Sequence, residues 1–526
     1  MRITLIILIQ LTCITVNAQW PKIFGHDSYD MIGRSIHESY DQGIYITGAE
    51  RLSLNADLQG YVLKTDINGY LLWKRYFENQ NGSNVVGLSQ YPDGGIIVSG
   101  ELSPSNQNRN GFFAKINNCG EKEWCKIIDE PGGSYCRENV ILADGGFVIL
   151  GGIDTYSYNR IWLYRFEADG TLIWEKTLIP DTTYFQETGY NLILTNDSCL
   201  LVTGFTYTVR EPNLGWPTPF WLKMDLIGNQ QWALPWIVTS HNVGDFGRTR
   251  QDCFGNFYCG GTYGTATRED ACIYKFTNSG DTLKHMKVFD QGNASIVQAL
   301  EFYQDSTLFL GVQWAIGNTG YSKVIRCDTI GNVINSMNVP LDGMTINFSD
   351  ISKDNKILGL SERPTYNGTP HWETCLFKFN QNLEYDSAYT VPRTYDSLCS
   401  GVILPEETFD LDCEIVSVNE FEKGEGDLNL RIYPNPASTL ITISLPDHFI
   451  EESRTGQFKV ITIFYKLIGD KHIEIVNMNG QIMDSRILPD QQTSIVFDVS
   501  QWPGGMYMVR LVNKGKVWAQ GKLIKK

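Results

Sequence analysis

The sequence predicts an all-β protein, a seven-bladed β-propeller followed by a small C-terminal β-sandwich of the immunoglobulin-like kind. Three observations predict this fold. A turn-and-strand phrase recurs seven times at intervals of 48 to 56 residues, and a hairpin phrase follows each copy. From Leu428 onward a different pattern begins, with alternating apolar residues and new turn signals.

The first phrase is an Asp and Gly turn followed by an apolar strand, as in DQGIYITG from Asp41, DGGIIVSG from Asp93 and DGGFVILGG from Asp144. The glycine that ends it marks the register of the seven copies: Gly48, Gly100, Gly151, Gly204, Gly260, Gly311 and Gly359. Four short strands in about 50 residues are typical of a propeller blade. One such sheet alone exposes two apolar faces, and radial packing of seven sheets buries them, which explains why the phrase recurs.

The second phrase is a hairpin, for example YVLKTDINGYLLWKRYF from Tyr61. It carries a basic residue in every copy and a Trp nine residues later in four copies: Lys64, Lys115, Arg165, Lys223, Lys275, Arg326 and Lys378, with Trp73, Trp124, Trp174 and Trp232. The basic residues either form a ring of cations that faces a central channel, or pack between blades with their heads paired locally. We favour packing, because degenerate copies keep them. The Trp residues likewise fit inter-blade packing better than a row for stacking sugars.

The N-terminus reads as a signal peptide. MRITLIILIQLTCITVNAQW has one Arg, an apolar run and a small residue before the expected cleavage between Ala18 and Gln19, so we expect the mature chain to leave the cytoplasm. The segment Trp20-Pro21-Lys22-Ile23-Phe24 contains the Trp-x-Lys pattern that is found in the fourth strand of a blade. This segment therefore either completes the last blade or adds an extra edge strand.

Charge and cysteine content exclude several classes of function. The 43 basic and 59 acidic side chains give a net charge of −16, which disfavours nucleic acid as a partner. No later segment approaches the roughly 20 apolar residues of a transmembrane helix. After removal of Cys13 eleven cysteines remain, none in Cys-x-x-Cys spacing, and seven His are scattered, so no zinc site is supported. The expected disulfides are Cys119 with Cys125 and Cys399 with Cys413.

The expected domains are a signal peptide at 1–18, the propeller at 19–395, a linker at 396–427 with the Cys399–Cys413 bridge, and a C-terminal domain at 428–526. Val416 to Asp427 is polar and Gly-containing, so we expect proteolysis to cut there first. In the last domain, turn signals and alternating apolar residues suggest about seven strands in a sandwich. Its distinctive residues are Tyr433, Pro434, Asn435, Pro436, Gly480, Gly504, Gly505, Tyr507 and Lys522.

These residues resemble, in their order, the C-terminal sorting domain of proteins exported by the bacterial type IX secretion system. The resemblance implies Sec export, passage through the outer membrane directed by the last domain, and the secretion machinery as a partner. It also implies removal of that domain, followed by release of the protein or its attachment at the surface. The stretch from His448 to Lys471 is longer than is usual between the first strands of that family.

The hairpin phrase also resembles the tryptophan-docking repeat of quinoprotein dehydrogenases, but only in its blade-packing residues, so no cofactor is expected. No nucleophile elbow, metalloprotease helix or sialidase Asp-box occurs. We therefore assign no catalytic, cofactor-binding or metal residues. The leading hypothesis is a non-catalytic module that binds an extracellular glycan or protein through loops such as Thr208 to Thr218 and Arg363 to His371. The alternatives are a channel-sited hydrolase or quinoprotein-like oxidoreductase, and a purely structural exoprotein.

Overall fold

The protein is all-β, and every regular element that the computed structural model describes is a strand. The structure describes residues 20–526 except 26–28, 54–55, 104–108, 131, 155–158, 181–183, 209–216, 236–245, 266–267, 282, 290–293, 304–305, 317–318, 340–344, 366–370, 417–429, 447–448, 456–457, 465–466, 468–470 and 490–491. The signal peptide, with Ala18 and Gln19, lies outside the described residues.

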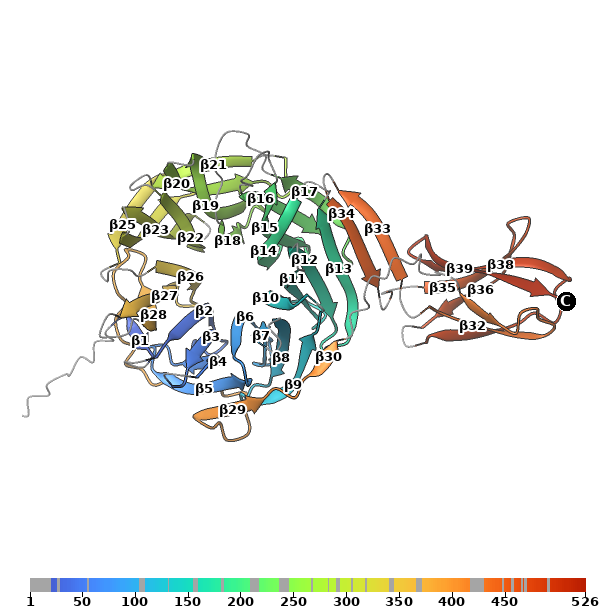
Figure 1. Ribbon diagram of the computed structural model, residues 1–526, viewed down its shortest axis with the longest axis horizontal. Helices are drawn as coiled ribbons and strands as arrows, with labels where there is room; N and C mark the ends of the chain where they lie inside the picture. Colours follow the sequence, from blue (N-terminus) through green and yellow to red (C-terminus); the bar gives the residue numbers. More distant parts are fainter. Residues whose placement is uncertain are drawn as a thin grey trace, which may run out of the picture.

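Seven four-stranded antiparallel blades form a ring, and the smaller sandwich lies beside it (Figure 1). The first three blades contain β2 (Met31–Glu38), β3 (Ile44–Arg51), β4 (Leu58–Thr65) and β5 (Leu71–Glu78); β6 (Ser83–Gln90), β7 (Ile96–Leu102), β8 (Asn110–Ile116) and β9 (Lys122–Ile128); and β10 (Ser134–Ile141), β11 (Phe147–Asp154), β12 (Asn159–Phe166) and β13 (Leu172–Pro180).

Blades 4 to 6 repeat this plan with β14 (Tyr184–Leu194), β15 (Leu200–Thr208), β16 (Pro217–Met224) and β17 (Gln230–Pro235); β18 (Phe246–Gln251), β19 (Phe257–Thr265), β20 (Arg268–Phe276) and β21 (Leu283–Phe289); and β22 (Ala294–Tyr303), β23 (Thr307–Ile316), β24 (Thr319–Asp328) and β25 (Val333–Asn338). In each blade the first strand faces the centre of the ring and the fourth lies outside. The strands around the motif glycines are buried, as packing between neighbouring blades requires.

Blade 7 takes its fourth strand from the N-terminus. Its own strands are β26 (Thr345–Ile351), β27 (Ile357–Thr365) and β28 (His371–Phe379), and β1 (Lys22–Phe24) pairs antiparallel with β28. The equivalent segment after β28 makes only an isolated bridge between Phe379 and Tyr385. Trp20 lies against Gly69 as Trp124 lies against Gly170, so Trp20 supplies the tryptophan that blade 7 lacks. Of the two alternatives for this segment, the strand that completes the blade is the observed one.

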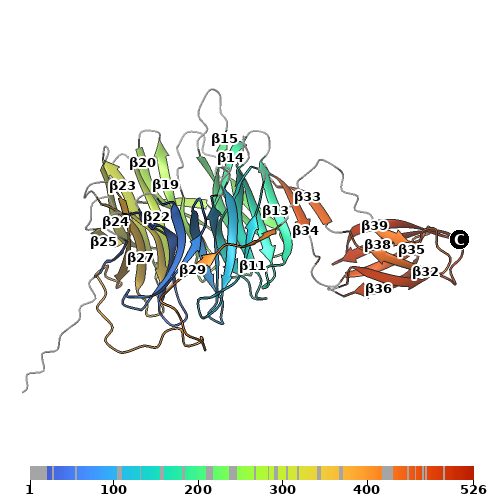
Figure 2. The same ribbon diagram turned by 60° about the horizontal axis from the view of Figure 1, so that its bottom comes forward.

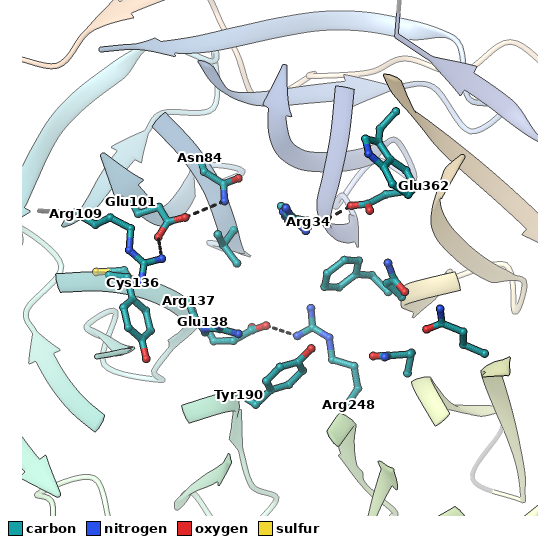
Figure 3. A pocket seen from close by; sticks show the side chains of 17 residues that line it. Arg34, Asn84, Glu101, Arg109, Cys136, Arg137, Glu138, Tyr190, Arg248 and Glu362 are labelled. Carbon is teal, nitrogen blue, oxygen red and sulfur yellow. Dashed lines mark hydrogen bonds and ion pairs between the residues drawn. The ribbon is translucent and has the colours of Figure 1, made fainter. Parts of the chain in front are cut away.

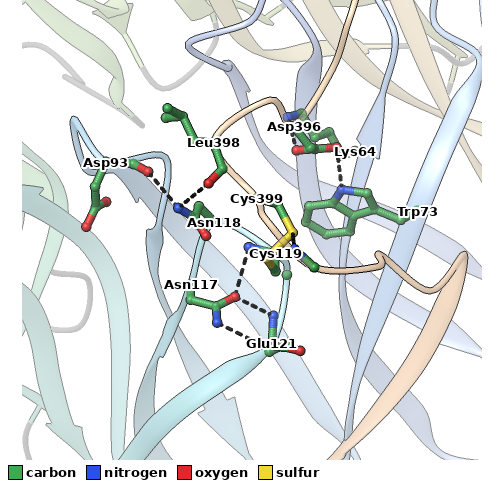
Figure 4. The surroundings of a disulfide bond; sticks show 12 residues. Lys64, Trp73, Asp93, Asn117, Asn118, Cys119, Glu121, Asp396, Leu398 and Cys399 are labelled. Carbon is green, nitrogen blue, oxygen red and sulfur yellow. Dashed lines mark hydrogen bonds and ion pairs between the residues drawn. A yellow bond between two sulfur atoms is a disulfide. The ribbon is translucent and has the colours of Figure 1, made fainter.

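The chain after β28 crosses the outer edges of blades 1 and 2. Here β29 (Glu406–Asp410) pairs in parallel with β5, and β30 (Glu414–Val416) pairs in parallel with β9. We call residues 387–416 the strap. The expected disulfides are wrong: Cys119 is bonded to Cys399 (Figure 4), and Cys125 is bonded to Cys413. Each bridge joins the blade 2 hairpin to the strap, because the fold brings together cysteines separated by 280 and 288 residues.

The C-terminal domain is a sandwich of seven strands. One sheet has the order β31 (Arg431–Tyr433), β32 (Leu440–Ser444), β37 (Ser494–Asp498); the other has β36 (Ile482–Leu488), β35 (Lys471–Asn477), β38 (Gly505–Asn513), β39 (Lys516–Lys525). Two further strands, β33 (Phe449–Thr455) and β34 (Phe458–Phe464), leave the sandwich as a hairpin and pair with β13 of blade 3. This hairpin falls within the long stretch between His448 and Lys471.

Candidate binding site in the central channel

The seven basic residues of the repeat lie on the third strands of the blades and none of them lines the cavity described below. Their heads make local contacts. Lys64 Nζ lies 2.6 Å from Asp41 and 2.5 Å from Asp396, and Lys223 Nζ lies 2.6 Å from Asp197. In four blades the turn before the second strand supplies an Asp partner for the basic residue of the same blade: Asp41 with Lys64, Asp144 with Arg165, Asp197 with Lys223 and Asp354 with Lys378.

The other three basic residues have different surroundings. Lys115 pairs with Glu123 at 3.0 Å, Lys275 lies over the ring of Tyr258, and the Arg326 guanidinium donates to Thr307 and to the carbonyl of Gln381. These contacts, too, are local to a blade or to its neighbour.

Basic and Trp residues of one blade reach the same point of the next. Arg165 and Trp174 both donate to the carbonyl of Leu226, at 2.5 and 3.2 Å. In blade 4, Lys223 Nζ and Trp232 Nε1 lie 2.6 and 2.9 Å from side-chain and carbonyl oxygens of Asn278. In blade 1 the strap provides the acceptor, since Lys64 and Trp73 both contact the carboxylate of Asp396. Trp124 packs on Phe147 of blade 3, so it also spans two blades.

The Lys64 cluster is electrostatically tight. Burial alone would raise the pKa of the Asp41 carboxyl, but the Lys64 ammonium and two backbone N–H donors hold it below its usual range. Lys64 itself is fully buried and Asp41 is 4% exposed. For Asp197, hydrogen bonds from Lys223, Thr195 and Asn278 outweigh partial burial and lower the pKa to about 2. Both carboxylates are therefore charged across the neutral range.

A cavity of about 550 Å³ occupies the centre of the ring (Figure 3). Every blade contributes to its wall through its innermost strand. A β-bulge interrupts each of these strands, and in every blade a residue at the bulge lines the cavity: Arg34, Val86, Arg137, Tyr190, Arg248, Gln298 and Asn347. A bulge re-aims a side chain out of the strand alternation, and here seven bulges aim seven side chains into one space.

The cavity wall is rich in arginine. It holds the side chains of Arg34, Arg109, Arg137 and Arg248 and those of Glu101, Glu138 and Glu362. Three arginines have carboxylate partners: Arg34 with Glu362 at 3.5 Å, Arg109 with Glu101 at 2.9 Å, and Arg248 with Glu138. Four arginines against three glutamates leave one positive charge in the wall of a protein that is strongly acidic overall.

Arg137 carries that excess charge. Its guanidinium lies 5.5 Å from the ring centre of Tyr135 and 5.4 Å from that of Tyr190. Among the residues that the structure describes, no carboxylate lies within ion-pair distance of it. Two aromatic rings thus hold a guanidinium in place while its donors stay free for an anionic group, which a planar fork binds with two parallel hydrogen bonds.

Other groups in the wall are polar or aromatic. Asn84, Gln298, Gln313 and Asn347 offer amides, and Trp372 is 42% exposed. Burial raises the pKa of the Cys136 thiol, so this thiol stays protonated and is a poor nucleophile. Burial also raises the pKa of the Glu362 carboxyl, with Arg34 acting against the rise.

The repeat phrases did not point to these cavity residues. Arg34, Val86, Arg137 and Tyr190 each stand fourteen residues before the motif glycine of their blade, in a segment where the copies differ from one another. In the other three blades the offset is 12 or 13 residues, so the signal was positional: one variable residue 12 to 14 residues before the motif glycine. Of the loops expected to form a contact surface, Thr208 to Thr218 and Arg363 to His371 lie largely outside the described residues.

The C-terminal motif residues meet at one end of the sandwich. The Asn435 side chain accepts from Ile524 N–H at 2.9 Å and donates to the Lys522 carbonyl at 2.6 Å, and Ala437 exchanges backbone hydrogen bonds with the last strand. The Tyr507 hydroxyl donates to Pro503 at 2.8 Å, and Gly480 has a φ of 81° in its turn. Tyr433 is 78% exposed, Pro434 and Pro436 flank Asn435, and Gly504 precedes β38, which begins at Gly505. The motif thus ties the entry of the domain to its final strand.

The family described as secretion system C-terminal sorting domain matches residues 431–526. These residues are a sorting domain of the type IX secretion system. The sorting domain indicates export to the cell surface or the extracellular space, and it implies an interaction with the secretion machinery. No curated protein matches the sequence of this chain. In the described part of the chain no helix is long and apolar enough to span a membrane. Within the same residues, no group of three or more His, Cys, Asp or Glu side chains could hold a metal ion.

Solved structures of low sequence identity are similar to this chain. The polysaccharide lyase Uly1 has 8% identity and a TM-score of 0.46, over 66% of this chain and 90% of its own. An ulvan lyase of polysaccharide lyase family PL25 has 9% identity and a TM-score of 0.43, over 68% and 95%. PorZ of Porphyromonas gingivalis, a surface component of the type IX system, has 11% identity and a TM-score of 0.34, over 92% and 69%.

Proposed function

We propose that this exported propeller binds an acidic extracellular glycan in its central cavity and does not transform it. The observation that carries the proposal is Arg137, whose guanidinium lies over the rings of two tyrosines in the cavity wall and has no carboxylate partner among the described residues. A carboxylate or sulfate on a sugar would complete it with charge-assisted hydrogen bonds.

The size and lining of the cavity suit a short saccharide. About 550 Å³ falls in the range of roughly 300–1,000 Å³ that is usual for small-ligand sites. The amides of Asn84, Gln298 and Asn347 can donate to and accept from hydroxyl groups, while the faces of Tyr190 and Trp372 offer apolar surface. A folded protein could not enter such a space, so we assign the cavity to a chain end or an oligosaccharide.

Binding without turnover is supported by the state of the cavity carboxylates. Glu101, Glu138 and Glu362 each pair with an arginine, so none of the three stands as the unpaired carboxyl group that a glycosidase uses as its acid or its nucleophile. One observation favours the alternative, a hydrolase: burial raises the pKa of Glu362, which would suit a general acid.

The test is direct binding of the mature full-length chain to an array of neutral, uronate-containing and sulfated oligosaccharides, followed by calorimetry of the hits. We expect acidic saccharides to bind, and Arg137→Gln to weaken them by about tenfold to a hundredfold, the worth of one charged hydrogen-bonding site. The matched control is Arg268→Gln on an outer blade surface, which should leave affinity unchanged.

Two results would contradict the proposal. Equal affinity for neutral and acidic saccharides, or full binding by the Arg137 variant, would remove Arg137 from the site. Release of new reducing ends from a bound saccharide, lost in Glu362→Gln, would establish the hydrolase instead. Absence of any saturable ligand would favour a structural exoprotein.

A further inference from the structure

The sorting domain touches the propeller through a hairpin that its own fold does not use. Neither sheet of the sandwich includes β33 or β34. Instead β34 pairs antiparallel with β13 over seven residue pairs, from Trp174 with Phe464 to Pro180 with Phe458. Figures 1 and 2 show the hairpin between blade 3 and the sandwich.

The hairpin occupies a free sheet edge. β13 is the outermost strand of blade 3, and an outermost strand presents unpaired N–H and C=O groups that accept another strand. The strap covers the corresponding edges of blades 1 and 2 with β29 and β30. Strand addition of this kind takes its affinity from main-chain hydrogen bonds. The edge of blade 3 is therefore covered by strand addition like those of blades 1 and 2, but by a segment of the sorting domain.

Position along the chain separates these attachments. The strap and both disulfides precede residues 417–429, so they stay with the propeller when the chain is cut in that segment. The hairpin follows the segment and stays with the sorting domain. Buried side chains of blades 3 and 4 and of the sandwich also fall in one apolar cluster.

We propose that the β33–β34 hairpin is a non-covalent clasp that keeps the sorting domain on blade 3 after the backbone is cut between residues 417 and 429. Its partner is the outer edge of β13 in the same chain. Cleavage and separation are then two distinct steps, and separation requires that β34 leave β13.

The experiment uses the full mature chain with a site-specific protease sequence placed within residues 417–429. After complete cutting, shown on a denaturing gel, we expect the propeller and the sorting domain to elute together from a size-exclusion column. The test variant carries Ile461→Pro and Thr462→Pro. Adjacent N–H groups of a strand point to opposite sides, so this pair removes one donor that faces β13. The matched control, Ile461→Thr with Thr462→Val, keeps both N–H groups.

We expect the cut proline variant to elute as two species and the cut control as one. A second variant replaces residues 448–465 by a Gly-Ser-Gly turn, which leaves the seven sandwich strands and Leu467 in place, and it should also separate after cutting. Circular dichroism of the separated fragments serves as the control, and we expect it to show both fragments folded. Separation of the cut parent chain, or co-elution of the cut turn variant, would overturn the clasp.

Discussion

The two disulfides allow a quantitative prediction, because their loops overlap along most of their length. In the chain-entropy account a bridge stabilises by restricting the unfolded chain, and the gain grows with the logarithm of the loop it closes. Cys119–Cys399 closes a loop across 280 residues, which corresponds to about 5.6 kcal/mol. Once that bridge exists, Cys125–Cys413 closes only the 6 residues from 119 to 125 and the 14 from 399 to 413. A loop of roughly 20 residues is worth about 3.3 kcal/mol.

Removal of either bridge alone, as Cys119→Ala with Cys399→Ala or Cys125→Ala with Cys413→Ala, should therefore cost only about 3 kcal/mol. Removal of both should cost about 9 kcal/mol, more than the two single losses together. For a unit of about 400 residues the unfolding entropy is about 0.8 kcal/mol per degree, so the expected drops in Tm are about 4 °C and about 11 °C.

Scanning calorimetry of the four proteins measures these values, at scan rates slow enough that Tm no longer changes with the rate. The relative size of the single and double losses tests the effect of the overlapping loops more strictly than any single value. If each single variant lost as much as the double variant, the two bridges would act as one all-or-none unit. If the stability loss of the double variant only equalled the sum of the two single losses, the strap would be restrained in the unfolded chain by something other than its cysteines. Either result would refute the reasoning.

Three other predictions concern single sites. Lys64→Met should destabilise the propeller by about 3–5 kcal/mol in urea unfolding, because two nearly buried carboxylates lose their cation. Lys115→Met, at a more exposed ion pair, should cost under about 1 kcal/mol. Similar losses in the two variants would show that burial of the ion pair does not set the cost. Burial raises the pKa of Glu38 to about 7, so the folded state keeps a proton that the unfolded state releases above about pH 4.5. The free energy of unfolding should therefore fall by up to about 3 kcal/mol as the pH rises from 4.5 to 7. Glu38→Gln should flatten that slope in a pH series of unfolding curves. Asn435→Ala removes two hydrogen bonds to the last strand and should lower export of the full chain, while leaving the Tm of the propeller unchanged. Export is measured by fractionation of a host with an intact type IX system. Undiminished export would show that the hydrogen bonds between Asn435 and the last strand are not needed.

The sequence was sufficient for the features that every blade repeats. Four strands per blade, their register from Gly48 onward and the seven-strand sandwich followed from turn residues and alternation, because these act locally in the chain. The sequence also indicated at Trp20 how the ring could close. Its role in blade 7 became clear only from the structure, where Trp20 packs against Gly69.

Features that depend on contacts between distant segments could not be read in this way. Cys119 and Cys125 are neighbours in sequence, yet each bonds to a strap residue, because the strap runs parallel to the outer strands of blades 1 and 2 and passes each cysteine in turn. The unusual length between His448 and Lys471 was visible in the sequence, but the pairing of this segment with β13 was not. An edge strand accepts a partner through its backbone, so the pairing requires no particular side chains that the sequence would show.

The cavity shows why repetition itself can hide a site. A residue that packs the same way in every blade must be nearly the same in every copy, as Lys64, Lys223 and Lys378 are. A ligand at the axis of the ring has no sevenfold symmetry, so the residues that contact it are expected to differ between copies. The seven bulge positions satisfy this condition, since they hold three arginines, a valine, a tyrosine, a glutamine and an asparagine at one structural place. In a propeller, then, the constant positions describe the scaffold, and specificity should be sought at the variable residue that every blade places at the same structural position. Here that position is the bulge of the innermost strand, and in blade 3 it holds Arg137.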